Sequence, residues 1–277
     1  MIIKKYNLRE KELNGFMPTL TTYITEDSFA YTGVNRVRPA VIVLAGGAYS
    51  DRCPREAEPV ALMFSNAGFH AFVVDYSIAP TRYPAALYEV CEAIKLIRKN
   101  ADKWYVNPNA IAVCGFSAGG HLAASVGTLW NTEPAVKCEN EQNKPNALIL
   151  CYPVIMYGEK AHKGSFYNLL GEGLSDEEYM RLSLEKKVSP DTPPAFLWHT
   201  FSDGAVPVEN SLEFARALRQ YNIPFEMHIY PDGPHGMSLA TAYTSYPSSI
   251  NSHVATWAKF ACDWMHIMFG DEQVVQP

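Results

Sequence analysis

The sequence is poor in basic residues, and those it has are not clustered. Lys and Arg number 23 against 29 Asp and Glu in a chain of 277 residues, which gives a formal net charge of −6 at pH 7. Proteins that bind nucleic acid concentrate Lys and Arg against the phosphates, and no such cluster occurs here. We therefore expect no nucleic-acid partner.

Long apolar runs are also absent. A helix needs about 20 consecutive apolar residues to cross a bilayer, and no run in the sequence approaches that length. Residues 1–6, which read MIIKKY, lack the apolar core of a signal peptide. The sequence therefore predicts a cytoplasmic protein with no membrane partner.

Cysteine is sparse and follows no ligand pattern. The six cysteines include no C-x-x-C pair, and no histidine stands at a metal-ligand spacing from them. Four of them lie in apolar segments. We interpret them as reduced, mostly buried thiols, and we expect neither a metal nor another cofactor.

The order of the apolar segments predicts the fold class. Short apolar strands alternate with helices, which predicts an α/β protein with a mostly parallel, doubly wound sheet flanked by helices. Residues 1–38 hold short alternating segments that favour antiparallel edge strands. The strands are predicted at residues 40–44, 69–75, 110–114, 147–151, 195–199 and 225–230, and the helices at 55–67, from Pro84 onward, at 118–129, at 208–221 and around 254–268.

The alternation breaks once, at residues 154–190. This segment holds aromatic residues, glycines and a capping-box pattern, Ser175-x-x-Glu178, that opens a short helix. A chain of this length commonly forms one α/β domain. We therefore predict a single domain over residues 1–277, with residues 154–190 as a small cap over the carboxyl edge of the sheet.

One stretch, residues 110–124, has the pattern of a strand, a sharp turn and a helix. Its sequence, AIAVCGFSAGGHLAA, places Ser117 at the centre of a Gly-x-Ser-x-Gly turn. Gly115 and Gly119 permit a strained backbone that exposes Ser117 beside the amino end of the next helix, where free N–H groups favour negative charge. This predicts a nucleophile, although a tight turn that happens to hold a serine has the same pattern.

A serine nucleophile needs a base within hydrogen-bond reach and an acid that orients the base. Of the eight histidines, only His235 lies in a loop just after a late strand. Asp203 follows the preceding strand and is the predicted acid. Glu209 is the alternative, but it stands in the first turn of a helix, where carboxylates are common. We expect His121 and His199 to be structural.

Three segments carry a resemblance to a known family. Residues 73–84 (VVDYSIAPTRYP), 115–122 (GFSAGGHL) and 206–211 (VPVENS) resemble α/β-hydrolase esterases. They are most similar to the hormone-sensitive-lipase-like branch and its bacterial acetyl xylan esterases, feruloyl esterases and related sugar-ester hydrolases. The resemblance covers roughly residues 40–265 and implies the α/β-hydrolase fold, whose triad order is the order of Ser117, Asp203 and His235.

The resemblance also implies an oxyanion hole. The family usually has His-Gly-Gly-Gly or Pro-Gly-Gly-Gly and an aromatic residue where residues 45–49 read AGGAY. By this match the N–H groups of Gly47, Ala48 and Ala118 would be the donors. Ala45 and Ala48 depart from the family pattern, and a methyl group at Ala48 fits a backbone of negative φ.

The predicted function is a serine carboxylesterase acting on a small-molecule ester. The cap is too short for a deep acyl tunnel and lacks a helix that would dock on lipid, so we expect short acyl groups, acetate above all, on a polar alcohol such as a sugar. Aromatic side chains can stack on a sugar, although they can equally pack the cap onto the sheet. The candidates are Tyr49, Tyr152, Tyr157, Phe166 and Tyr167.

Two alternatives remain open. A peptidase of the prolyl-oligopeptidase type shares this sheet, but such enzymes normally carry a large additional domain that is absent here. A catalytically silent binding module can also use a hydrolase fold. The sequence leaves open whether the chain forms a homo-oligomer.

Overall fold

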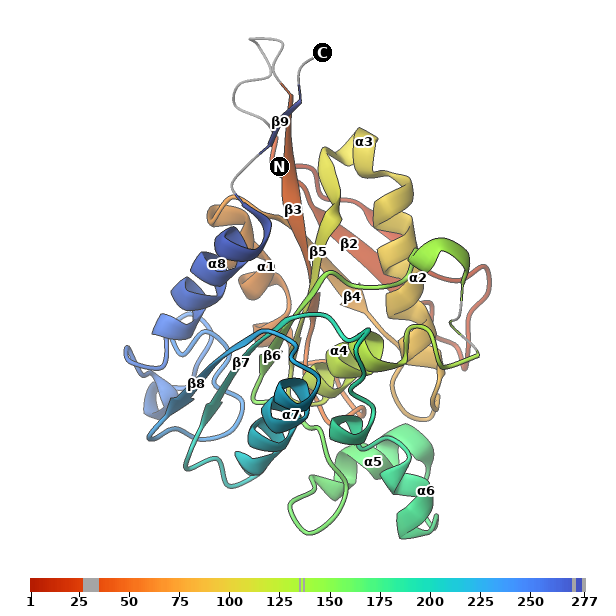
Figure 1. Cartoon of the computed structure of the whole chain (residues 1–277), viewed down its shortest axis with the longest axis vertical. Helices are drawn as coiled ribbons and strands as arrows, with labels where there is room; N and C mark the ends of the chain where they lie inside the picture. The colour runs from red at the N-terminus through yellow and green to blue at the C-terminus, as the bar shows by residue number, and fades with distance from the viewer. Residues whose placement is uncertain (27–34, 135, 137, 271–272, 276–277) are drawn as a thin grey trace.

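A mostly parallel sheet runs through the protein, and helices cover both of its faces (Figure 1). The computed structural model describes residues 1–26, 35–134, 136, 138–270 and 273–275. The strands are β1 (Lys5–Asn7), β2 (Thr19–Tyr23), β3 (Asn35–Leu44), β4 (His70–Asp75), β5 (Val106–Phe116), β6 (Ala147–Cys151), β7 (Ala195–Thr200), β8 (Phe225–Tyr230) and β9 (Gln273–Val275).

The helices fall between the strands, as the alternating pattern predicts. They are α1 (Glu58–Asn66), α2 (Ala85–Lys99), α3 (Ala101–Trp104), α4 (Ala118–Leu129), α5 (Lys163–Leu170), α6 (Asp176–Met180), α7 (Glu209–Gln220) and α8 (Thr256–Phe269). A 3-10 turn, η2 (Pro54–Glu56), leads into α1.

The strand order is β1-β2-β4-β3-β5-β6-β7-β8, with β9 paired to the start of β3. β2 runs antiparallel to both of its neighbours, whereas β4, β3, β5, β6, β7 and β8 pair in parallel. Parallel neighbours bring the carboxyl ends of their strands to one edge of the sheet. The predicted fold class and the antiparallel start of the chain are therefore confirmed.

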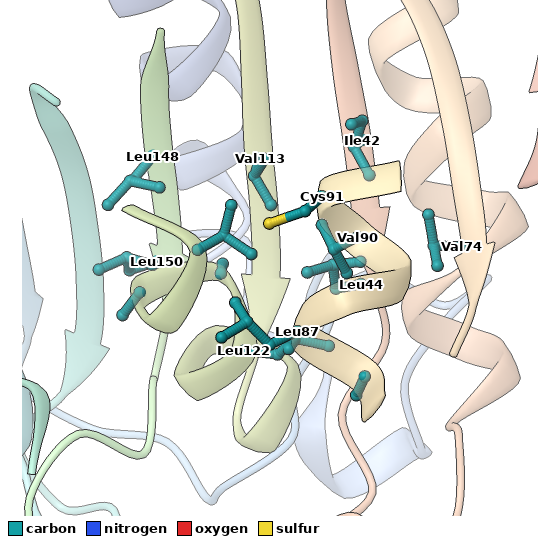
Figure 2. Packing of buried hydrophobic residues seen from close by; sticks show 14 of the residues in the cluster. Ile42, Leu44, Val74, Leu87, Val90, Cys91, Val113, Leu122, Leu148 and Leu150 are labelled. Carbon is teal, nitrogen blue, oxygen red and sulfur yellow. The ribbon is translucent and has the colours of Figure 1, made fainter. Parts of the chain in front are cut away.

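The core lies in two layers, one on each face of the sheet. One layer joins the strands to α2, α4 and α7, and the other joins them to α1 and α8. Figure 2 shows Cys91 of α2 beside Val113 of β5, and Val90 of α2 beside Leu44 of β3, in the first layer. Residues 40–44 of β3 are fully buried, which is why this strand is apolar along its length rather than alternating.

Residues 154–190, the predicted cap, hold α5 and α6 between β6 and β7. Figure 1 shows both helices beyond the carboxyl end of the strands. The predicted capping box opens α6: the Ser175 side chain accepts from the Glu178 N–H, and the Glu178 side chain accepts from the Ser175 N–H. That residues 1–277 form one domain with this segment as its cap stays a prediction.

Three short elements were not predicted. α3 and β9 are too short to show a periodic pattern, and α5 carries no capping residue that would mark its start. In the part of the chain that the structure describes, no helix is long and apolar enough to cross a membrane.

Candidate active site

The turn between β5 and α4 holds Ser117 in a strained backbone conformation, with φ 53° and ψ −118°. Side chains other than glycine rarely adopt positive φ, and such strain is typical of functional sites. A Cβ at Gly115 would lie 2.1 Å from the Gly119 carbonyl oxygen, and one at Gly119 would lie 2.3 Å from the Leu44 carbonyl oxygen. Gly115 therefore lets α4 begin close against β5, and Gly119 lets it cross close to the end of β3.

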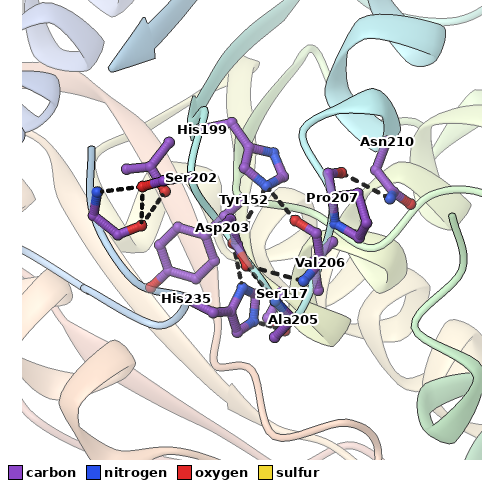
Figure 3. Close-up of polar contacts among 12 residues, drawn as sticks. Ser117, Tyr152, His199, Ser202, Asp203, Ala205, Val206, Pro207, Asn210 and His235 are labelled. Atoms are coloured by element: carbon purple, nitrogen blue, oxygen red, sulfur yellow. Dashed lines mark hydrogen bonds and ion pairs between the residues drawn. The ribbon is translucent and has the colours of Figure 1, made fainter. Parts of the chain in front are cut away.

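The structure brings Ser117, His235 and Asp203 into one hydrogen-bonded row (Figure 3). The His235 Nε2 lies 2.7 Å from the Ser117 Oγ, and its Nδ1 lies 2.6 Å from the Asp203 Oδ2. An ionised carboxylate only accepts hydrogen bonds, so the His235 proton is on Nδ1. Nε2 is then free to accept the serine proton.

Asp203 is buried and surrounded by donors. Its Oδ1 accepts from the N–H groups of Ala205 and Val206, both at 2.9 Å, and its Oδ2 lies 3.4 Å from the His199 Nε2. Burial by itself raises the pKa of Asp203, but the hydrogen bonds from His199 and His235 outweigh it and hold the pKa well below its usual range. Asp203 is therefore a fixed negative charge facing His235.

The alternative residues lie elsewhere. Glu209, the other candidate acid, is partly exposed in the first turn of α7, and its Oε1 lies 3.7 Å from the Lys160 Nζ. His121 is buried, accepts from the Tyr49 hydroxyl at 2.9 Å and donates to the Leu182 carbonyl at 3.0 Å. Its contacts are internal, as predicted for a structural histidine.

The glycine-rich loop after β3 lies directly against the serine. A Cβ built on Gly46 would come within 3.0 Å of the Ser117 Cβ. The Ala48 carbonyl accepts from the Asn168 side chain at 2.9 Å, which ties the loop to α5. Among the described residues, nothing accepts a hydrogen bond from the N–H of Gly47 or Ala48. These two donors are therefore available to a ligand.

The conformation of Ala48 differs from the expectation. Its φ is +55° rather than negative, because the Gly47 carbonyl accepts from the N–H groups of both Ser50 and Asp51 at 2.9 Å and closes a tight turn around it. A left-handed alanine costs roughly 1–2 kcal/mol relative to an ordinary conformation. This loop therefore stores strain next to the strained serine.

Comparison with known proteins agrees with the fold and the sequence patterns. Residues 30–218 match the BD-FAE family. The chain belongs to the BD-FAE family. An acetylxylan esterase from Xylanibacter ruminicola is 31% identical over 226 residues, and an endo-1,4-beta-xylanase B from Butyrivibrio fibrisolvens is 37% identical over 235 residues. These matches cover 79% and 82% of this chain but only 45% and 35% of the relatives, so the chain spans less than half of their length.

Solved structures match over nearly the whole chain. An acetyl ester-xyloside bifunctional hydrolase from Caldicellulosiruptor lactoaceticus is 38% identical with a TM-score of 0.83, and the match covers 97% of both chains. The carboxylesterase Cest-2923 from Lactobacillus plantarum WCFS1 is 27% identical with a TM-score of 0.84, covering 98% of this chain and 99% of the other. The α/β-hydrolase fold and the resemblance noted in the sequence are therefore confirmed.

The predicted sugar-stacking residues are buried in the structure of this BD-FAE chain. Each is at most 6% exposed: Tyr49, Tyr152, Tyr157 and Phe166. The three tyrosine hydroxyls find internal partners on His121, Glu56 and Asp176, which lets the rings be fully buried. Tyr167 is half-buried and packs on Tyr179. The alternative interpretation, in which these rings pack the cap onto the sheet, describes the structure better.

Other aromatic residues face solvent near the site, and the sequence analysis did not select them. Phe201, in the turn that carries Asp203, is 71% exposed, and Tyr246 is 68% exposed. Tyr246 lies over the Arg55 guanidinium at 5.2 Å, and Arg55 donates to the carbonyl of Gly236, the residue after His235. Only exposure distinguishes these rings from the buried ones, and exposure is not visible in sequence.

Glu56 is a buried polar residue near the site that no sequence pattern marks. It lies in η2 at the start of a segment predicted as helix, where a single acid carries no pattern. Its Oε2 accepts from the Gly46 N–H at 2.8 Å, which places it beneath the glycine-rich loop.

The six cysteines are free thiols and four are buried, as predicted. Within the described ranges, no three His, Cys, Asp or Glu side chains lie together in a way that could hold a metal ion.

The glycine contacts at the turn make a testable prediction. Gly119→Ala should lower the free energy of unfolding by about 1–3 kcal/mol or more, because the new Cβ meets backbone that cannot rotate away. Urea unfolding of the variant measures this. The matched control is Gly164→Ala in α5, whose Cβ would lie 3.6 Å from the His162 ring and which should gain roughly 0.5–1 kcal/mol. Equal stability of the two variants would contradict the close crossing.

Proposed function

We propose that this chain is a serine carboxylesterase that hydrolyses short acyl esters, acetyl esters of sugars above all, through an acyl-enzyme on Ser117. The observation that carries the proposal is the unbroken hydrogen-bonded row from Ser117 through His235 to Asp203, beside two backbone donors that have no partner among the described residues. The names of the two structural neighbours and of the acetylxylan esterase relative support the ester chemistry.

The mechanism follows from the positions of the protons. His235 Nε2 takes the Ser117 proton as Oγ attacks the ester carbonyl carbon, and Asp203 stabilises the imidazolium that forms. The N–H groups of Gly47, Ala48 and Ala118 donate to the oxyanion. His235 then returns the proton to the alcohol oxygen as the ester bond breaks. Water attacks the acyl-enzyme with His235 again as base, releasing the acid and restoring Ser117.

The packing next to the serine supports a short acyl group. Val154 donates its N–H to the Ser117 carbonyl and, with Phe166 and Leu169, helps line a small space that holds no void the size of a water molecule. A long acyl chain would have to displace these side chains. The exposed rings of Phe201 and Tyr246 support a polar, ring-shaped alcohol, because aromatic faces pack on the apolar faces of sugars.

Replacing the nucleophile gives the most direct test. Ser117→Ala should lower kcat for p-nitrophenyl acetate by about 10⁶, as loss of the serine does in a well-studied protease. A fluorophosphonate probe should label the wild-type protein at Ser117, located by peptide mass spectrometry, and should not label the variant. Absence of labelling in the folded wild-type protein would favour a silent binding module.

The acid can be tested against its competitor. Asp203→Asn should lower kcat on the order of 10⁴ by stabilising the wrong tautomer of His235, as the same change does in a serine protease. Glu209→Gln should change kcat less than about twofold, because Glu209 contacts Lys160 rather than His235. If the two effects were reversed, Glu209 would be the acid.

The acyl preference can be measured with p-nitrophenyl esters from acetate to decanoate. We expect kcat/KM to be greatest for acetate and to fall with chain length, because a tight site cannot accommodate added methylenes. A site with room would gain about 0.8 kcal/mol from burying each methylene and would favour longer chains. A maximum at octanoate or beyond would contradict the short-acyl proposal while leaving the serine mechanism intact.

A further inference from the structure

One buried carboxylate near the serine has no role in the mechanism above. Glu56 is 2% exposed, yet both of its oxygens are bonded. Its Oε2 accepts from the Gly46 N–H at 2.8 Å, and its Oε1 accepts from the Tyr152 hydroxyl at 2.6 Å. Gly46 immediately precedes Gly47, a proposed oxyanion donor. Glu56 therefore holds the backbone of the oxyanion loop from inside the protein.

The same carboxylate also reaches the loop that carries the base. The Tyr152 hydroxyl accepts from the Ser238 N–H at 2.8 Å while it donates to Glu56. The Tyr152 ring lies edge-on to the His235 ring with centroids 5.1 Å apart, as Figure 3 shows for the two labelled side chains. Glu56 thus connects the oxyanion loop with the His235 loop through one tyrosine.

The turn that carries Glu56 makes three more bonds to the region after His235. The Ser238 hydroxyl donates to the Arg55 carbonyl at 2.6 Å. The Arg55 guanidinium donates to the carbonyls of Gly236, at 3.3 Å, and Thr244, at 2.7 Å. The turn η2 therefore bonds the chain after His235 at three points besides the bond through Tyr152.

The hydrogen bonds also fix the charge of Glu56. The Gly46 N–H can only donate, and the Tyr152 hydroxyl gives its proton to Glu56 because its oxygen already accepts from Ser238. Both carboxylate oxygens are therefore acceptors, which matches the ionised form. Burial raises the pKa of Glu56 above its usual value, and the bonds from Tyr152 and Gly46 together with the nearby charges of His235 and Arg55 offset only part of that rise. The titratable and charged groups that interact with Glu56 are Cys53, Arg55, Tyr76, Cys151, Tyr152 and His235.

We propose that Glu56 is a positioning residue of the esterase site: it fixes the oxyanion loop relative to His235, and its negative charge favours the imidazolium that forms when His235 takes the serine proton. The proposal rests on the proposed serine mechanism. It assigns Glu56 no contact with substrate, because its oxygens are fully used by Gly46 and Tyr152.

The first test is Glu56→Gln. The amide oxygen can keep the Gly46 bond, but the charge is lost and the Tyr152 hydroxyl proton loses its acceptor. We expect kcat for p-nitrophenyl acetate to fall roughly 10- to 100-fold with KM changed less than about threefold, since loss of a whole oxyanion donor costs about 10²–10³. The acidic limb of the kcat/KM profile should move to lower pH, because His235 loses a negative charge that favours its protonated form.

Two further variants separate positioning from general stability. Tyr152→Phe keeps the charge of Glu56 and its bond to Gly46 but removes the hydroxyl that joins Glu56 to the Ser238 N–H. We therefore expect kcat to fall without movement of the acidic limb. Glu89→Gln is the matched control. Glu89 is also buried and accepts from the N–H and hydroxyl of Ser77 at 2.7 and 2.6 Å, but it has no bond to the triad. The Glu89→Gln variant should have a lower Tm, with kcat and the acidic limb of the pH profile unchanged.

The outcomes distinguish this inference from the proposed function. If Ser117→Ala is inactive while Glu56→Gln keeps wild-type kcat and an unmoved acidic limb, the inference is wrong and the serine mechanism stands. An equal kcat loss in Glu89→Gln would also overturn it, because the effect would then be general destabilisation. If Glu56→Gln does not fold, Tyr152→Phe decides, and a wild-type kcat in that variant overturns the inference. Failure of fluorophosphonate to label the wild-type protein would instead refute the proposed function.

Discussion

The close crossing of α4 over the end of β3 is the constraint on which the site depends. It is possible only because Gly119 has no Cβ, which would lie 2.3 Å from the Leu44 carbonyl oxygen, and Gly115 likewise lets α4 begin close against β5, since a Cβ there would lie 2.1 Å from the Gly119 carbonyl oxygen. The same crossing forces Ser117 to a φ of 53° and sets its Cβ against the glycine-rich loop. The cost of this strained turn is offset by the two buried layers that hold β3, β5 and α4 in place.

Pairing of buried polar groups fixes the rest of the site. Asp203, His199, His121 and Glu56 are all buried, and each has a hydrogen-bond partner on another segment of the chain: His235, Ser211, Leu182 and Tyr152, respectively. An unpaired buried polar group costs about 1–3 kcal/mol, so each pair specifies one arrangement of the segments that it joins. The loops around Ser117 have little regular structure. Their geometry is therefore fixed by these side-chain hydrogen bonds rather than by the backbone bonds of helices or sheets.

The sequence predicted the row of three side chains and not the surface around it. Ser117, Asp203 and His235 each follow a predicted strand, and parallel strands end at one edge, so chain order alone predicts that they meet. The roles of Gly47, Ala48 and Ala118 came from family resemblance. The aromatic residues could not be sorted from sequence, because whether a ring such as Tyr152 faces solvent depends on partners such as Glu56, 96 residues away in the chain. Glu56 itself is a single acid without periodic context.

Asp203 and Glu56 are connected to His235 in different ways, and that difference indicates different roles. Asp203 bonds the His235 Nδ1 directly at 2.6 Å and selects the tautomer that leaves Nε2 free. Glu56 reaches the ring only through Tyr152, so it cannot select a tautomer, but it bonds the loop that carries the proposed oxyanion donors. In the proposed mechanism, positive charge grows on His235 as the proton moves, and negative charge grows on the substrate oxygen that Gly47 and Ala48 would bind. A carboxylate at Glu56 favours the first charge and disfavours the second, because like charges repel. The N–H of Gly46 points to Glu56, while those of Gly47 and Ala48 have no partner among the described residues. In the proposed mechanism, the loop therefore directs one amide to the carboxylate and leaves the next two to stabilise the oxyanion.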